Sequence, residues 1–310
     1  MARNLNDTLV FAKVVEHGSF VSAARALRLP KATVSRRVQG LETRLGATLL
    51  HRTTRSLGLT EAGSVYYEHS RRIARALDDA ESAVGQLQGG PRGWLRVSAP
   101  YSLGVEWISP LLSEFRERHA DVRAELVLDA MQDTPRDIID HEIDVALRVG
   151  ELPDSNLVAR RLGVLETQVY ASPRYLERHG EPRHPDDLRR HRVLAMSGQR
   201  RSGGDPMWLL HDGTHANQFR VDATFVANDP AALRGALLAG EGLMLANGAL
   251  MAPHIASGAA RRVLTGWSGP DFELNAVFPR GRVQSPKVRA FIDFLVERLH
   301  FEPSDNGATP

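Results

Sequence analysis

Cysteine is absent from all 310 residues of the chain. This absence excludes disulfide bonds, zinc sites built on thiolates and any sensor that works by thiol oxidation. It agrees with folding in a reducing compartment. We therefore expect a cytoplasmic protein.

Long uninterrupted apolar runs are also missing. The most apolar later stretch, residues 236–253, contains Glu241 and three glycines, so it does not predict a transmembrane helix. Near the N-terminus, Asp7, Lys13 and Glu16 interrupt the apolar pattern, and we expect no signal peptide. The sequence therefore favours a globular protein that has no membrane partner.

The usual signatures of catalysis are missing as well. No glycine-rich phosphate loop precedes a helix, and Ser98, Ser102 and Ser197 lack the setting of a nucleophile elbow. His211 and His215 have a spacing that could bind a metal, but the intervening Asp-Gly-Thr is typical of a loop. We expect no enzymatic activity, no metal and no cofactor besides a small-molecule effector of unknown identity.

Acidic residues are scarce in the N-terminal region. Residues 1–62 hold ten Lys and Arg but four Asp and Glu, a net charge of +6. The whole chain carries +2, so the remainder carries −4. A basic segment on a mildly acidic body indicates that the segment meets a polyanion and that the body does not.

The basic segment has the pattern of short helices that meet at a tight corner. Residues 5–17 predict a first helix that ends at Gly18, and Ser19 is a suitable N-cap for a second helix. Ala23 and Ala24 allow two helices to approach closely. A third helix is expected to begin near Pro30-Lys31, and its apolar stripe is Val34, Val38, Leu41 and Leu45.

The third helix combines that apolar stripe with Lys31, Arg36 and Arg37. We interpret it as the recognition helix of a helix-turn-helix, and residues 49–59 as a two-stranded wing with arginines at its tip. The alternative is a three-helix bundle with a solvated basic face. That alternative explains the apolar stripe but not the second arginine cluster at Arg52 and Arg55, so the sequence favours DNA binding.

A longer helix is predicted to begin after Thr60, its expected N-cap, and to end near the Gly89-Gly90-Pro91 linker. Its apolar positions repeat at heptad spacing over about three heptads. The alternative is an amphipathic helix packed on its own domain. We favour a homodimer through this helix, with the contact positions Tyr66, Ile73, Leu77, Ala80, Val84 and Leu87.

Strand and helix patterns alternate after Gly93, which predicts an α/β body. The expected strands are 94–99, 122–128, 143–149, 160–171 and 272–278, and the expected helices are 105–115, 229–239 and 286–300. Such sheets bind ligands beyond the carboxyl ends of their strands. The polar tail 303–310 is expected to be disordered.

The N-terminal pattern closely resembles the LysR-type transcriptional regulators. The matching residues are Phe11, Val14, Gly18, Ser19, Phe20, Ala23, Ala24, Leu27, Val34, Ser35, Arg36, Leu41, Glu42, Leu45, Gly46, Leu49, Leu50, Arg52, Thr53, Thr54, Arg55, Leu59, Thr60 and Gly63. The body supports the resemblance at 144–150, 171–176, 187–191, 228–229 and 288–294.

The resemblance implies an α/β fold class with a winged helix-turn-helix at 1–60, a dimerisation helix and hinge at 61–89, and an effector-binding domain at 90–302. That domain is expected to resemble type II periplasmic binding proteins, with lobe one at 90–162 and 270–302 and lobe two at 163–269. The implied function is sequence-specific binding of double-stranded DNA at an inverted repeat, as a homodimer or homotetramer that works with RNA polymerase.

For the DNA contacts, we expect Lys31, Ser35 and Arg36 to enter the major groove and read bases. Arg37 and the tip of the wing are expected to hold phosphates or reach the minor groove. Lys31 stands where relatives commonly have Gln, and Arg28 stands where they often have Gly. The full set of candidates is Lys31, Thr33, Ser35, Arg36, Arg37, Arg52, Thr53, Thr54 and Arg55.

For the effector, free N–H groups at the helix start after Pro100 could hold an anion. Arg148 could add charge, and Ser197 and Asn228 would face it across a cleft. In the alternative, Ser102 and Asp229 cap their own helices and Arg148 pairs with a structural acid, and the sequence favours neither. The candidates are Pro100, Tyr101, Ser102, Arg148, Ser197, Asn228 and Asp229.

Two further functions compete with this interpretation. A solute-binding protein would share the α/β body, but the basic N-terminal segment argues against it. A DNA-binding regulator that needs no effector, with a body that serves only oligomerisation, would share every N-terminal motif. DNA control that is retained without any response to a ligand would distinguish this regulator from an effector-responsive one.

Overall fold

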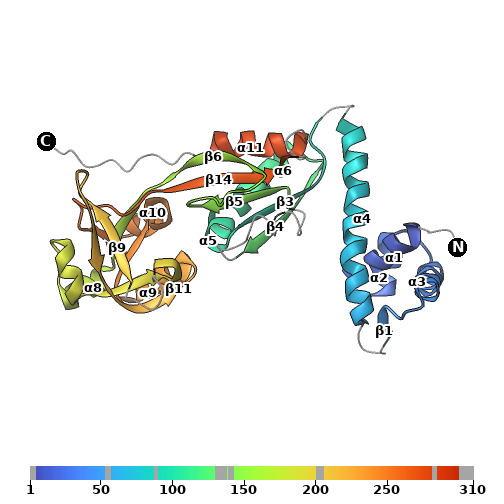
Figure 1. Ribbon diagram of the computed structural model, residues 1–310, viewed down its shortest axis with the longest axis horizontal. Helices are drawn as coiled ribbons and strands as arrows, with labels where there is room; N and C mark the ends of the chain where they lie inside the picture. Colours follow the sequence, from blue (N-terminus) through green and yellow to red (C-terminus); the bar gives the residue numbers. More distant parts are fainter. Residues whose placement is uncertain are drawn as a thin grey trace. The chain divides into compact units, whose positions relative to one another are not determined.

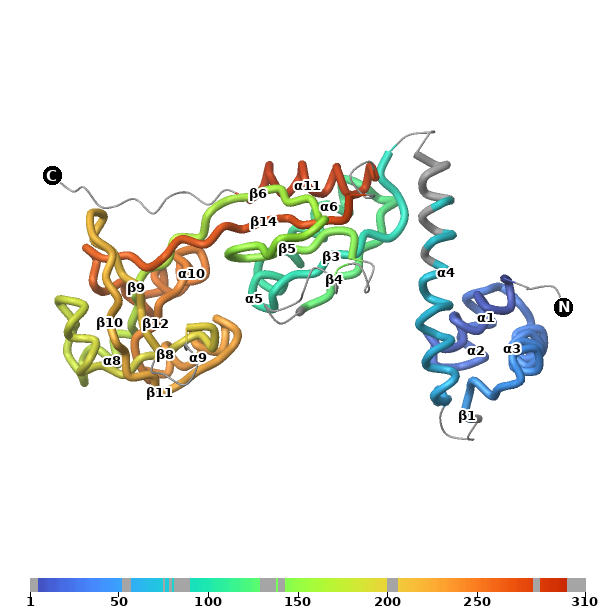
Figure 2. Tube along the Cα trace, in the orientation of Figure 1, coloured from blue at the N-terminus to red at the C-terminus, as the bar shows by residue number. Residues whose placement is uncertain are grey.

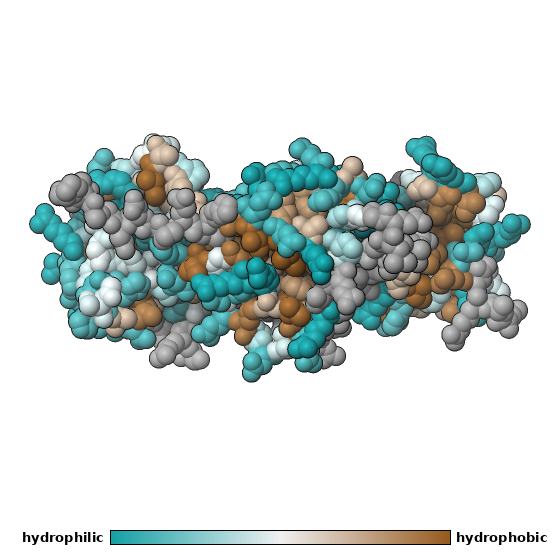
Figure 3. Space-filling view, turned by 90° about the horizontal axis from the view of Figure 1, so that it is seen from above, coloured by the Kyte–Doolittle hydropathy of each residue, from teal (hydrophilic) through white to brown (hydrophobic). Residues whose placement is uncertain are grey.

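The computed structural model describes residues 5–52, 57–86, 90–129, 138, 143–199, 206–280 and 285–299. The chain divides into two compact units, Met1–Gly89 and Gly90–Pro310. Within the described residues, no helix is long and apolar enough to span a membrane. On the face shown in Figure 3, apolar residues reach the surface in patches in both units.

The N-terminal unit is a winged helix-turn-helix followed by a long helix (Figure 1). Its core contains Phe11, Val14, Val34, Val38 and Leu41, all buried. The stripe expected on the third helix is therefore the side that packs, except for Leu45 at its end, which is 39% exposed. The elements are α1 (Leu5–Glu16), α2 (Phe20–Ala26), α3 (Lys31–Leu45), β1 (Leu50–Arg52), β2 (Leu57–Leu59) and α4 (Glu61–Gln86).

The corner between α2 and α3 is built from local signals. The Ser19 side chain accepts a hydrogen bond from the Ser22 N–H, which caps α2, and Ala23 and Ala24 are buried at the corner. Pro30 is the N-cap of α3 and makes no side-chain cap. Arg28 adopts a positive φ of 52°, a conformation that favours glycine.

The wing is fastened to α3 and α4. The Glu42 carboxylate accepts hydrogen bonds from the N–H groups of Leu49 and Leu50, at 2.8 and 3.2 Å. Thr60 caps α4 through the Gly63 N–H at 2.9 Å. A Cβ on Gly63 would overlap the Leu49 carbonyl oxygen, so only glycine lets α4 start this close to the wing.

Tyr66, the first of the expected heptad positions, packs inside its own unit. Its ring packs on Phe11 with the ring centroids 5.7 Å apart, and its hydroxyl lies 2.9 Å from the Thr8 hydroxyl oxygen. Tyr66 therefore belongs to the core of the N-terminal unit. This agrees, for Tyr66, with the alternative that the helix packs on its own domain. Farther along α4, Ile73 and Leu77 are 40% and 37% exposed.

The first lobe of the C-terminal unit is a five-stranded sheet of described strands, in the order β4-β3-β5-β14-β6. One face carries the main core, where α6 and α11 pack (Figure 1). The buried Lys287 ammonium lies 3.3 Å from the Asp144 carboxylate and ties the first turn of α11 to the sheet. The strands are β3 (Gly93–Pro100), β4 (Val122–Asp129), β5 (Val145–Val149), β6 (Leu157–Leu165) and β14 (Phe272–Pro279), and the last helix is α11 (Pro286–Arg298).

The helix after β3 begins earlier than the expected 105. It runs through α5 (Tyr101–Leu103), the π-helical segment η1 (Gly104–Ile108) and α6 (Ser109–Arg118). Pro110 has no N–H to donate into the preceding turn, and this accounts for an irregular, wider turn before it. The result is that Ser102 and Glu106 lie on the same helical segment.

The second lobe is a five-stranded sheet in the order β11-β8-β12-β7-β13. Helices α9 and α10 pack on one face, while α8 and the β9–β10 hairpin contribute to the core on the other. The expected N-cap is confirmed, because Asp229 accepts a hydrogen bond from the Ala231 N–H. The elements are β7 (Thr167–Ala171), α8 (Pro173–His179), β8 (Arg192–Met196), β9 (Met207–His211), β10 (Ala216–Arg220), β11 (Asp222–Ala227), α9 (Pro230–Ala239), β12 (Leu243–Asn247), α10 (Gly248–Ala256) and β13 (Arg261–Val263), with short 3-10 turns at Pro185–Arg190 and Ser197–Gln199.

Two strands cross between the lobes. β6 and β14 run side by side toward the second lobe (Figure 2), and Leu165 pairs with Phe272 at their end. The first sheet therefore continues to Leu165, past the expected boundary at residue 162, because β6 keeps its partner β14 up to that residue. The return of the final strand and helix to the first lobe agrees with the expectation.

Replacing Arg28 by glycine is expected to stabilise the N-terminal unit. A Cβ in the left-handed region costs about 1–2 kcal/mol, and the larger freedom of glycine in the unfolded chain offsets part of the gain, which leaves about 0.5–1 kcal/mol. Arg28→Ala is the matched control, since it removes the same charge but keeps the Cβ. Urea unfolding followed by circular dichroism measures both variants, and equal stabilities would contradict the role assigned to φ.

Candidate functional site

The exposed face of α3 is the first candidate surface. Val34, Val38 and Leu41 are buried, and Arg36 is exposed on the side of the helix opposite to them. Lys31 is also exposed, whereas Thr33, Ser35 and Arg37 are half-buried on the flanks of the stripe. The arrangement presents one central arginine with polar and basic side chains on either side.

The other expected DNA contacts lie on the wing. The strands β1 and β2 pair as an antiparallel hairpin in which His51 faces Gly58. Arg52 closes the first strand, and its side chain lies outside the described residues. Thr53, Thr54 and Arg55 at the tip also lie outside them. The hairpin expected from residues 49–59 is therefore present, and the roles of its tip remain predictions.

The exposed part of α4 carries the remaining heptad positions. Ile73, Leu77 and Ala80 are exposed along one side of the helix. Large apolar side chains on a protruding helix favour a partner that covers them. The side chain of Val84 and all of Leu87 lie outside the described residues.

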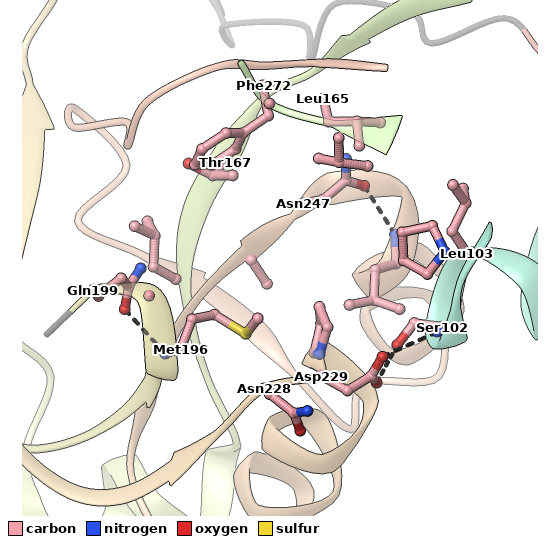
Figure 4. A pocket seen from close by; sticks show the side chains of 18 of the residues that line it. Ser102, Leu103, Leu165, Thr167, Met196, Gln199, Asn228, Asp229, Asn247 and Phe272 are labelled. Atoms are coloured by element: carbon pink, nitrogen blue, oxygen red, sulfur yellow. Dashed lines mark hydrogen bonds between the residues drawn. The ribbon is translucent and has the colours of Figure 1, made fainter. Parts of the chain in front are cut away.

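A cavity of about 520 Å³ lies between the two lobes of the C-terminal unit (Figure 4). Lobe one supplies residues from β3, the following helix and the crossing strands, and lobe two supplies residues from the ends of β8, β11 and β12. This is the ligand position expected for α/β sheets. Of the expected residues, Pro100, Ser102, Ser197, Asn228 and Asp229 line it.

Two expected residues do not line the cavity. Tyr101 precedes Ser102 on the helix, and its side chain is 55% exposed. Arg148 alternates along β5 with Leu147 and Val149, so its side chain lies on the other face of the sheet. There its guanidinium donates to the Ser98 hydroxyl at 3.0 Å and to the Leu147 carbonyl at 2.8 Å. Arg148 thus bonds to the neighbouring strand β3 and to its own strand β5.

Several lining residues were not expected from the sequence. Glu106 and Trp107 come from the helix after Ser102, Thr167 from the start of β7, Phe272 from the crossing strand β14, and Asn247 from the end of β12. Position at a strand end was a usable signal for Asn247. Thr167 and Phe272 carried none. Thr167 begins β7 directly after the crossing strand β6, and Phe272 begins the crossing strand β14, so the course of the chain between the lobes brings them to the cavity.

Asp229 joins the two lobes. Its carboxylate caps α9 of lobe two through the Ala231 N–H at 2.8 Å and accepts from the Ser102 N–H of lobe one at 3.1 Å. It also accepts a short hydrogen bond from the Ser102 hydroxyl. The capping alternative is therefore right for Asp229 and wrong for Ser102. The N-cap of α5 is Pro100, and the Ser102 hydroxyl and N–H bond to residues of the other lobe.

An ion pair runs parallel to that contact. The Arg234 guanidinium of α9 binds both carboxylate oxygens of Glu106, at 2.7 and 2.8 Å. Both side chains are largely buried, and bidentate geometry strengthens such a pair. We call the set Ser102, Glu106, Asp229, Ala231 and Arg234 the inter-lobe contact.

The His211–His215 stretch forms the turn of the β9–β10 hairpin. Asp212 accepts hydrogen bonds from the Thr214 N–H, the Thr214 hydroxyl and the His215 N–H, and these lower the pKa of Asp212 to about 2. His211 bonds to the Gly269 carbonyl. Among the residues that the structure describes, no cluster of three metal-binding side chains occurs.

Comparison with known proteins assigns the family. Residues 5–64 match the family model for the bacterial regulatory helix-turn-helix protein of the lysR family, and residues 88–300 match the LysR substrate binding domain. The chain belongs to the LysR family of transcriptional regulators. An HTH-type transcriptional regulator of Xanthomonas campestris is 59% identical over 97% of this chain and 87% of its own length.

Solved structures support the assignment over the whole length. The LysR-type regulator CrgA of Neisseria meningitidis is 34% identical and covers 96% of this chain and 99% of its own, with a TM-score of 0.60. The virulence activator AphB of Vibrio cholerae is 30% identical and covers 95% and 99%, with a TM-score of 0.61. The fold class and family expected from the sequence are thereby confirmed.

Asp229→Ala is expected to destabilise the C-terminal unit by about 1–3 kcal/mol, because it removes the cap of α9 and leaves the Ser102 N–H without its acceptor. Asp222→Ala, which removes an exposed carboxylate at the start of β11, is the control. Thermal and urea unfolding of the full-length protein measure both. A loss for Asp229→Ala no larger than that for Asp222→Ala would contradict the inter-lobe contact.

Proposed function

We propose that this LysR-family regulator binds an inverted-repeat operator as a homodimer or homotetramer and responds to a small molecule in the inter-lobe cavity. The observation that carries the proposal is the exposed Arg36 face of α3, set on a winged helix-turn-helix whose buried stripe leaves that face outward. A recognition helix of this kind enters the major groove.

On DNA, Arg36 donates two hydrogen bonds to a guanine edge, and Lys31 and Ser35 contact neighbouring bases. Arg37 and Thr33 on the flank of the helix, together with the wing residues Arg52 to Arg55, hold phosphates or reach the adjacent minor groove. This division separates contacts that read sequence from contacts that supply affinity. It is supported by the central exposure of Arg36 and the partial burial of Arg37.

Dimerisation is proposed through the exposed side of α4, which carries Ile73, Leu77 and Ala80. Pairing two copies buries this apolar side and places two recognition helices for two half-sites. The proposal includes action in the cytoplasm, contact with RNA polymerase and the absence of an enzymatic role. The relatives' names as transcriptional regulators support it.

The cavity between the lobes supports an effector-responsive regulator over one whose body only oligomerises. Its volume of about 520 Å³ suits a small molecule. A ligand that contacts both lobes lowers the free energy of the closed arrangement relative to the open one, and so increases the population of the closed arrangement. We propose that this shift alters how the protein acts on its operator.

Arg36→Ala is expected to weaken binding to the operator about tenfold or more and to weaken binding to random DNA much less. The reason is that one bidentate arginine–guanine pair discriminates between bases by about 1–3 kcal/mol. The operator is first selected from random oligonucleotides, and affinities are then measured by fluorescence anisotropy. Arg55→Ala is the comparison, expected to weaken both DNAs and to reduce the salt dependence. Equal losses on both DNAs for Arg36→Ala would remove its base-reading role.

Charged substitutions on α4 test the dimer. Ile73→Glu combined with Leu77→Glu is expected to convert the assembly to lower oligomers and to weaken binding to a complete operator more than to a single half-site, because two charges replace apolar contacts. Arg72→Glu is the control on the same helix, at an exposed position outside the heptad. Analytical ultracentrifugation gives the masses. An unchanged mass for the double variant would place the interface elsewhere.

A further inference from the structure

Charge is unevenly distributed in the wall of the inter-lobe cavity. Among its described lining residues, the ionisable side chains are the carboxylates Glu106 and Asp229, and none is Lys, Arg or His. Both carboxylates already have partners in the inter-lobe contact. The described wall therefore offers an anionic ligand no cation to pair with.

The place expected to hold an anion is taken. The Ser102 N–H, at the start of the helix that follows β3, donates to the Asp229 carboxylate at 3.1 Å. A ligand carboxylate at this N–H would have to displace Asp229 or lie beside it, and two like charges at such a distance repel each other. The protein thus fills its own anion position with an internal carboxylate.

The remaining polar side chains of the described wall are neutral: the hydroxyls of Thr167 and Ser197 and the amides of Gln199, Asn228 and Asn247. Asn247 uses its Oδ1 to cap α10 through the Ala249 N–H at 2.7 Å and the Leu250 N–H at 3.1 Å. Gln199 uses its Oε1 to accept from the Met196 N–H and the Trp208 indole N–H. Because the oxygens are engaged, the amide nitrogens are the groups that these side chains can present to a ligand as donors (Figure 4).

The rest of the described wall is largely apolar. Leu103, Trp107, Leu165, Leu245, Leu250 and Phe272 line it from both lobes. Apolar ligand surface gains free energy by leaving water for such a wall. A negatively charged group entering the same space would lose its hydration without gaining an opposite charge from the described wall.

We propose that the cavity binds an uncharged ligand with an apolar body and acceptor oxygens, such as a carbonyl, that meet the amides of Asn247 and Gln199. This inference rests on the proposed function of the cavity as the effector site. It names the chemical class that the site takes. Neutral ligands satisfy the donors, and Asp229 rejects acids.

Three probes with one ring system and different charges test the proposal: naphthamide, naphthoate and naphthylmethylamine. Their affinities for the full-length protein are measured by isothermal titration calorimetry near neutral pH. Naphthamide is expected to bind about tenfold or more tightly than either charged probe. The carboxylate of naphthoate loses hydration without a cation to pair with, and the ammonium of naphthylmethylamine meets only carboxylates that already have partners in the inter-lobe contact. Equal or tighter binding of a charged probe, or no binding of any probe, would overturn the proposal.

Variants locate the site and test the cause of the selectivity. Phe272→Ala is expected to weaken naphthamide binding, while Phe225→Ala, which removes an exposed ring on β11 outside the cavity wall, leaves it unchanged. Asp229→Asn is expected to reduce the preference for naphthamide over naphthoate about threefold or more, since it removes the repelling charge. An unchanged preference would contradict the role given to Asp229.

The same preparations are tested for binding to the selected operator by fluorescence anisotropy. Retained operator binding with the wrong order of probe affinities overturns the ligand class alone. Failure to discriminate operator from random DNA overturns the proposed mode of DNA recognition, whichever probe binds. The two failures are therefore distinguishable.

Discussion

The contact between Asp229 and Ser102 links the two lobes of the C-terminal unit and places a carboxylate in the wall of the cavity between them. One carboxylate caps α9 in the second lobe and accepts two hydrogen bonds from Ser102 in the first. This bond joins the two lobes. Because Asp229 also lies in the cavity wall, its negative charge contributes to the electrostatic potential of the space between the lobes. The Arg234–Glu106 pair holds the same two helices a turn farther on. The proposed movement of the lobes and the proposed choice of ligand thus depend on one small set of polar groups.

The N-terminal unit follows a simpler constraint. Burial of Val34, Val38 and Leu41 against α1 and the wing leaves the opposite side of α3 for DNA. Glu42 fixes the end of that helix to the start of the wing, and Gly63 lets α4 begin in close contact with it. The two surfaces proposed to meet DNA, α3 and the wing, are therefore held together by the Glu42 carboxylate and by the close start of α4 at Gly63.

Local signals predicted much of this protein. Ser19, Thr60 and Asp229 cap helices as their positions indicate, since capping depends on neighbours within one turn. Tyr66 was assigned to a dimer contact because a heptad pattern cannot distinguish a partner helix from the helix's own domain. The residues that line the cavity were harder to predict from the sequence. The cavity's strand-end residues were predictable, but Phe272 of β14 and Thr167, which follows β6, reach it only because β6 and β14, two strands distant in sequence, pair and run between the lobes.

Arg148 shows a further limit of the sequence. Its position near a strand end suggested a ligand contact, but alternation along β5 directs it to the other face, toward Ser98. The central claim, a paired reader that presents α3 to DNA, is tested most directly by quantitative footprinting of the full-length protein on its selected operator. The account predicts two protected half-sites about one helical turn apart. One asymmetric protected segment, or uniform protection without half-sites, would contradict it.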